Sequence, residues 1–121
     1  MKALKITYWV TTSIVALMMT YSAYAYLTQP AMAQGFAHLG FPSYFRIELA
    51  IAKVIGAIAL LAPLGVKVKE WAYAGFFIVF VSAFIAHSAS GDPFSIRIMP
   101  VIFLAFLAAS YYTYHKLPKA A

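Results

Sequence analysis

The sequence has no cysteine and few charged residues, and each absence excludes a class of protein. Of its 121 residues, 10% are charged and 64% are hydrophobic. A soluble domain typically carries about 25% charged residues, so this chain has too little polar surface to stay dissolved in water. Without cysteine, the chain forms no disulfide and no thiolate metal site. The composition and length predict a single membrane domain spanning residues 1–121, because lipid solvates apolar side chains that water does not.

Acidic residues are scarcer still, with three Asp and Glu against nine Lys and Arg, for a net charge of +6. In a soluble protein this balance would suggest nucleic acid. Here the basic residues are few and lie mostly between apolar segments. We therefore interpret them as signals of membrane orientation, and we expect no nucleic-acid partner.

Four apolar segments are each long enough to cross a bilayer, which requires about 20 helical residues. They span approximately residues 7–27, 44–64, 70–88 and 96–115. The predicted fold is therefore an all-α integral membrane four-helix bundle. The first segment also resembles a signal peptide, with basic residues before it and Ala31-Met32-Ala33 after it. Its length and the three segments that follow favour an uncleaved helix.

The segment 30–39 separates the first two predicted spans and has two open interpretations. Pro30 suits the first turn of a short helix on the membrane surface, and Gly40 suits its C-terminal cap. Met32, Phe36 and Leu39 would then share one face of that helix. The alternative is an irregular loop.

Lysines mark alternate sides of the predicted spans. The N-terminal tail, the central loop and the C-terminal tail each carry two, and the other two loops carry none: the lysines are Lys2, Lys5, Lys67, Lys69, Lys116 and Lys119. Short cytoplasmic loops carry the excess of Lys and Arg in membrane proteins. We therefore predict that both termini and the central loop are cytoplasmic.

Ionisable side chains lie inside the predicted spans, where a charge commonly costs about 2.5–3.5 kcal/mol at the centre. Lys53 is about nine residues into the second segment, roughly 13 Å deep, and leans back toward the outer surface. His87 lies near the outer end of the third segment and leans inward, so the two side chains converge in depth. We predict a ligand-binding polar pocket open to the outer leaflet, formed by Lys53, His87, Glu48, Asp92, Arg46, Arg97 and His38.

Each of these residues also has a structural interpretation. Lys53 could snorkel or pair with a buried acid, and His87 could be a core histidine. Asp92 could cap a helix, and the arginines could contact lipid headgroups. Arg97 lies in a loop if the fourth helix begins only at Pro100. The histidines lack metal-ligand spacing, so we expect no metal site.

Small residues at a spacing of four predict close helix approach in two places. These are Ala52 with Gly56 and Ala105 with Ala109. We expect them to pack helices inside the chain, and we also predict a homodimer. No Gly-rich nucleotide motif or catalytic nucleophile motif is present.

Several stretches of the chain together resemble one family. They are residues 36–42 (FAHLGFP), 50–56 (AIAKVIG) and 69–76 (KEWAYAGF), and His87 followed by Gly91-Asp92. The chain resembles the DoxX-like family of small bacterial membrane proteins over almost its whole length. The resemblance implies a four-helix protein of the bacterial cytoplasmic (inner) membrane, and the motif residues it carries over are Lys53, Gly56, His87 and Asp92.

The resemblance also implies a role in quinone-linked oxidation of reduced sulfur compounds, within membrane oxidoreductase complexes. Our leading hypothesis is an accessory subunit that holds a quinone or lipid headgroup, next to a redox partner protein. Lys53 and His87 would donate hydrogen bonds to the ligand, and Asp92 or Glu48 would orient them. The alternatives are a catalytic quinone-linked subunit, with His87 as proton carrier, and a structural or assembly protein without a ligand. Because the chain has no cysteine and no recognisable cofactor motif, we expect it not to be an enzyme on its own.

Overall fold

The computed structural model describes residues 2–62 and 65–117, and over these residues the chain consists of helices joined by short turns, with no strand. It contains five α-helices: α1 (Lys2–Thr28), α2 (Pro30–His38), α3 (Ser43–Leu61), α4 (Val66–Ala89) and α5 (Phe94–Lys116). By length and composition, α1, α4 and α5 are able to cross a membrane. The 19-residue α3 is not among these three, and it carries Arg46, Glu48 and Lys53. The chain is therefore an all-helical membrane protein.

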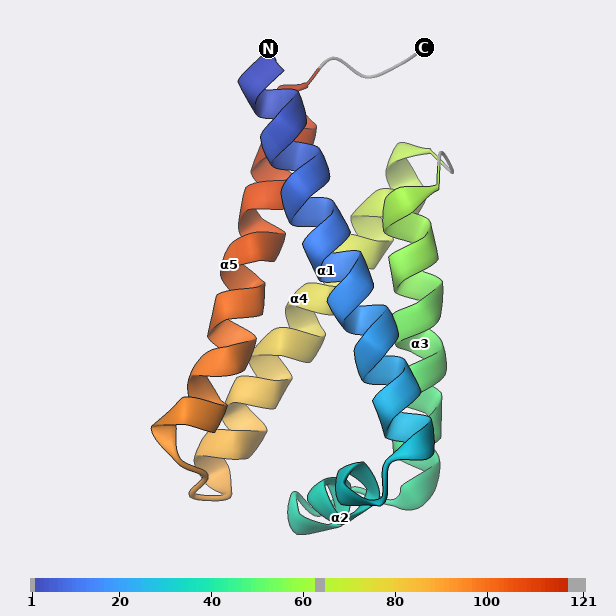
Figure 1. Cartoon of the computed structure of the whole chain (residues 1–121), viewed down its shortest axis with the longest axis vertical. Coiled ribbons are helices and arrows are strands. Elements are labelled where there is room, and N and C mark those ends of the chain that lie inside the picture. Colours follow the sequence, from blue (N-terminus) through green and yellow to red (C-terminus); the bar gives the residue numbers. More distant parts are fainter. Residues whose placement is uncertain (1, 63–64, 118–121) are drawn as a thin grey trace.

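The two ends of the molecule differ in their arrangement (Figure 1). The start of α1, the ends of α3 and α5 and the start of α4 lie at one end, here called the terminal end. The short α2 and the turn from α4 to α5 lie at the other, here called the α2 end. α1 packs against both α3 and α5, and α4 packs against the same two helices. At the α2 end the pair α1 and α3 diverges from the pair α4 and α5 (Figure 1).

The segment after Pro30 is a helix, which is one of the two interpretations that the sequence leaves open. Its end is a Schellman motif, with Gly40 at a φ of 87°. In this motif the amide of Phe41 bonds to the carbonyl of Phe36, and that of Gly40 to the carbonyl of Ala37. Phe36 is buried, and its ring packs edge-to-face against the ring of Tyr26 in α1. The Schellman motif therefore ends α2 two residues after Phe36, the residue that packs against α1.

A cluster of buried hydroxyls joins three helices toward the terminal end. Ser110 of α5 lies 2.5 Å from the Thr12 hydroxyl of α1 and 2.7 Å from the Tyr73 hydroxyl of α4. All three side chains are buried. Tyr73 belongs to the apolar core of the protein, which also includes Val15, Met19, Leu60, Phe76 and Leu107. Since no water reaches these hydroxyls, their mutual bonds fix how α1, α4 and α5 meet.

Lys69 lies inside α4 and is buried, which corrects the prediction that it belongs to a loop. The helix begins at Val66 rather than near residue 70, after Gly65 with a φ of 100°. The ammonium of Lys69 donates to the carbonyl of Leu60, in the last turn of α3, and to the Tyr8 hydroxyl at 3.3 Å. Carbonyls at a helix C-terminus carry partial negative charge, so Leu60 is a favourable partner for this cation.

Replacing Ser110 with alanine tests the hydroxyl junction. The change leaves the hydroxyls of Thr12 and Tyr73 without their shared partner, so we expect the free energy of unfolding to fall by about 1–2 kcal/mol. Thermal or denaturant unfolding in a mild detergent measures this loss. Ser82→Ala is the matched control, because Ser82 is an exposed residue of α4. Equal stability of the two variants would show that the junction contributes nothing.

Candidate functional site

Lys53 is buried in α3, with 5% of its surface exposed, and it contacts α1. Its ammonium donates to Ser22 Oγ at 2.9 Å and to the Tyr26 hydroxyl at 2.6 Å. It also lies 4.0 Å from the centre of the Tyr26 ring, in a cation–π contact. Ser22 and Tyr26 are four residues apart in α1 and therefore share one face of that helix. In the described part of the chain, no carboxylate lies within ion-pair distance of Lys53.

Arg46, one turn into α3, contacts the same tyrosine. Its guanidinium donates to the backbone carbonyl of Tyr26. That carbonyl has no partner within α1, because the residue four positions later is Pro30, which lacks an N–H. The Nε of Arg46 is buried and has no hydrogen-bond partner among the described residues. Tyr26 thus accepts bonds from two cations, Lys53 at its hydroxyl and Arg46 at its carbonyl.

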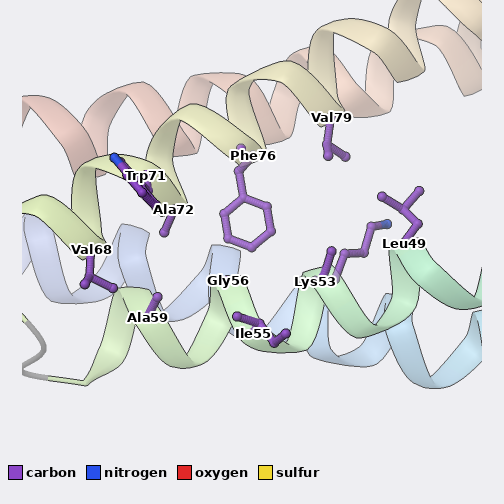
Figure 2. Close-up of a pocket in the computed structure, with 12 residues that line it drawn as sticks. Leu49, Lys53, Ile55, Gly56, Ala59, Val68, Trp71, Ala72, Phe76 and Val79 are labelled. Carbon is purple, nitrogen blue, oxygen red and sulfur yellow. The ribbon is translucent and has the colours of Figure 1, made fainter.

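An apolar groove of about 360 Å³ lies between α3 and α4, and Lys53 forms part of its wall. Figure 2 shows the Lys53 side chain running along α3 toward Leu49, with Val79 of α4 on the opposite side. The Phe76 ring points from α4 toward Gly56 (Figure 2). A Cβ at Gly56 would lie 2.6 Å from Phe76 Cζ, so only glycine leaves room for this ring. Gly56 therefore sets the spacing of α3 and α4 beside Lys53.

The remaining predicted packing residues lie in different settings. Ala52 is exposed and lines the groove together with Gly56. Ala105 is exposed and Ala109 is half-buried on α5.

Asp92 binds two histidines at the α2 end. His87 Nδ1 lies 2.6 Å from Asp92 Oδ2, and His38 Nε2 lies 3.1 Å from Asp92 Oδ1. Because an ionised carboxylate only accepts, both imidazoles donate. A Schellman motif centred on Gly91 produces the first contact, since the amide of Asp92 bonds to the carbonyl of His87 and folds the chain back over that residue.

We call His38, His87 and Asp92 the Asp92 clasp. His38 is the last residue of α2, and α2 packs on α1 and α3. Asp92 lies between α4 and α5, so its bond to His38 joins the two diverging helix pairs. The hydrogen bond from His87, with a further contribution from His38, lowers the pKa of Asp92 below its ordinary value of 3.8.

The structure therefore divides the predicted pocket into separate parts. Lys53 and Arg46 meet at Tyr26, while His38, His87 and Asp92 form the clasp. Over residues 2–62 and 65–117, no hydrogen bond joins Lys53 to His87. Glu48 is exposed and makes no described hydrogen bond or ion pair, so of the two acids predicted to orient His87 only Asp92 contacts it.

Arg97 is a half-buried residue in the first turn of α5, which begins at Phe94 rather than at Pro100. Its Nε has no hydrogen-bond partner among the described residues. In the same part of the chain, no group of three or more His, Asp or Glu side chains could hold a metal ion.

Ser22 and Tyr26 are the site residues that sequence reasoning missed. Two polar side chains four apart in an otherwise apolar span were a usable signal, because such residues usually face the protein interior. The position of Tyr26 four residues before Pro30, which leaves its carbonyl without a helical partner, was a second signal.

Comparison with known families agrees with this architecture. The model of the DoxX-like family matches residues 10–110. The chain therefore belongs to the DoxX-like family, and the resemblance noted from its motifs is confirmed. No curated protein and no solved structure matches the chain. Family membership and the apolar helices together define a small multi-pass membrane protein.

Acidification tests the Asp92 clasp. A carboxyl whose pKa is lowered by folding stabilises the folded form above its ordinary pKa of 3.8, and this stabilisation is lost as the pH falls through the lowered value. We expect Asp92→Asn to unfold at a lower temperature than the wild type at neutral pH. The two unfolding temperatures should converge as the pH falls below 3.8 and through the lowered pKa of Asp92.

Glu48→Gln is the control for this experiment, because Glu48 is exposed and unpaired in the described part of the chain. This variant should keep the acid dependence of the wild type. An Asp92→Asn protein as stable as the wild type at neutral pH would show that the clasp does not hold the α2 end together.

Proposed function

We propose that this protein is an accessory subunit of a redox system in the bacterial cytoplasmic membrane, and that it holds the polar group of a quinone or lipid beside Lys53. In this role α3 is a fourth membrane span, both chain termini are cytoplasmic, and the α2 end faces the outside. The chain acts as a homodimer, and a partner protein supplies the redox chemistry. The family assignment and the apolar helices support the membrane setting.

One observation carries this proposal: among the described residues, the buried ammonium of Lys53 has only neutral hydrogen-bond partners. Lys53 bonds to two hydroxyls, whereas a buried cation is usually paired with an acid. An ammonium has three N–H donors, and these two bonds use two of them. A carbonyl or other oxygen acceptor of a ligand would complete the set. The groove along α3 and α4 supplies an apolar surface for the rest of such a ligand.

The contacts of α3 also explain how a helix with three charged residues can cross the membrane. Arg46 lies near the α2 end of the helix, where it bonds to the Tyr26 carbonyl. Lys53 turns its ammonium toward the same end and bonds to α1. Glu48 lies in the second turn of α3, close to the interface in this orientation. Charges near a helix end reach the membrane surface at a lower cost than charges at its centre.

Reporter fusions test the orientation. Fusions after Lys69 and at the C-terminus should both report the cytoplasm, and a fusion near Gln34, in α2, should report the outside. The alternating lysine content is the physical basis for this expectation. A cytoplasmic signal near Gln34 would contradict the four-span topology.

Replacing Lys53 with methionine tests the ligand. Methionine keeps the length of the side chain and removes the charge. The variant should accumulate in the membrane and lose at least about nine-tenths of the lipid-soluble molecule that copurifies with the wild type, since a hydrogen bond to a charged donor is worth about 1.5–3 kcal/mol. Mass spectrometry of the extracted protein measures this loss.

Lys69→Met is the matched control, because Lys69 is the other buried lysine of the described chain and lies in the first turn of α4. It should lower stability and retain the ligand. If no molecule copurifies with the wild type and both variants are equally destabilised, the two lysines are structural and the binding function is wrong. A copurifying quinone, and its reduction with a defined electron donor, would favour the catalytic alternative.

A further inference from the structure

The cations around Tyr26 have no negative partner in the described chain. Asp92 pairs with His38 and His87, and Glu70 pairs with His115. Glu48, the third acid, is exposed and pairs with neither cation. Lys53 and Arg46 thus bring two positive charges to one residue of α1, and no described side chain neutralises either of them.

The same group also offers hydrogen-bond donors in excess. An ammonium cannot accept a bond, so the oxygens of Ser22 and Tyr26 accept from Lys53, and their own O–H groups remain to donate. The third N–H of Lys53 and the buried Nε–H of Arg46 have no described partner either. The donors around Tyr26 therefore lack acceptor oxygens.

A neutral carbonyl and an oxyanion meet this need differently. A quinone carbonyl would accept one or two of these bonds and leave both cations uncompensated at a site screened from water. A phosphate oxyanion accepts several bonds and also neutralises charge. Arginine and lysine are both well suited to phosphate, arginine through its fork of N–H groups and lysine as a point charge.

The groove identifies the rest of the ligand. Its wall is almost entirely apolar apart from Lys53, and it runs along α3 and α4, which approach closely where the Phe76 ring packs against Gly56. Lys53 points along this groove toward the α2 end (Figure 2). An acyl chain therefore fits along α3 and α4, with its headgroup toward the α2 end, where the Lys53 ammonium lies. Arg46 is not part of the groove wall, but it lies two turns nearer the start of α3 and bonds to the same tyrosine as Lys53.

We infer that the ligand held beside Lys53 is a phospholipid with a net negative headgroup, bound by Lys53 and Arg46 together, with Ser22 and Tyr26 as positioning residues. This inference rests on the proposed function and specifies its ligand. It makes Arg46 a second binding residue and assigns the apolar groove to an acyl chain.

Binding to the full-length protein, delipidated in a neutral detergent, tests the inference. The probes are phosphatidylglycerol, phosphatidylcholine, a short-chain ubiquinone and inorganic phosphate, each titrated and followed by native mass spectrometry. Phosphatidylcholine also has a phosphate, but its choline cancels the charge. We expect phosphatidylglycerol to bind at least about tenfold more tightly than each of the other three.

Variants of Arg46 test whether this residue contributes to the affinity for phosphatidylglycerol. Arg46→Gln should weaken phosphatidylglycerol binding by about tenfold, and Arg46→Lys should retain most of it, because the charge remains. Lys67→Gln is the control for general attraction of anionic lipid, since Lys67 is exposed in the first turn of α4. The comparison of lipids on the wild type stands even if an Arg46 variant fails to fold.

Each adverse result has a separate meaning. Ubiquinone binding that Lys53→Met abolishes, together with equal affinity for the two lipids, would overturn the anionic ligand and leave the proposed function intact. Binding of free phosphate as tight as that of phosphatidylglycerol would overturn the lipid. An equal loss in Lys67→Gln and Arg46→Gln would show nonspecific attraction. Failure of all four probes to bind would remove the proposed function itself.

Discussion

The contact between Lys53 and Tyr26 is the constraint around which the α2 end is built. Lys53 of α3 carries a buried positive charge. The hydroxyls of Ser22 and Tyr26, both in α1, accept hydrogen bonds from its ammonium. Pro30 ends the hydrogen-bond ladder of α1 and frees the Tyr26 carbonyl for Arg46. The ring of Tyr26 also supports α2 through Phe36. One aromatic residue therefore holds together α1, α2 and α3.

The two ends of the molecule solve the problem of buried polar groups in different ways. Toward the terminal end, the hydroxyls of Thr12, Ser110 and Tyr73 bond to one another, and Lys69 bonds to a helix-end carbonyl. At the α2 end, cationic donors remain without partners among the described residues. Lys69, like Lys53, makes two described hydrogen bonds to neutral oxygens, so the ends differ in the buried Nε–H groups of Arg46 and Arg97, which lack described partners and favour a ligand at the α2 end.

The sequence predicted the helical class and the family, because apolar run length and local motifs carry that information. It also identified Lys53, His87 and Asp92 as unusual, since ionisable residues stand out in an apolar chain. It did not predict their partners. Whether Lys53 turns toward His87 or toward α1 depends on how helices rotate against each other, and helical spacing within one segment does not determine that rotation.

Lys69 shows the same limit at the other end. Its place between two spans made it look like a loop residue that signals orientation. The structure begins α4 four residues earlier than that boundary and turns Lys69 inward to the end of α3. The Asp92 clasp also required three-dimensional information, because His38 and Asp92 are 54 residues apart in the chain.

The central claim is that a ligand completes the hydrogen bonding of Lys53. An experimental structure of the protein extracted with its native lipids would test this most directly. The account predicts non-protein density within hydrogen-bonding distance of Lys53 Nζ, continuing along the groove between α3 and α4. A well-resolved Lys53 enclosed only by Ser22 and Tyr26, with no density in the groove, would contradict it.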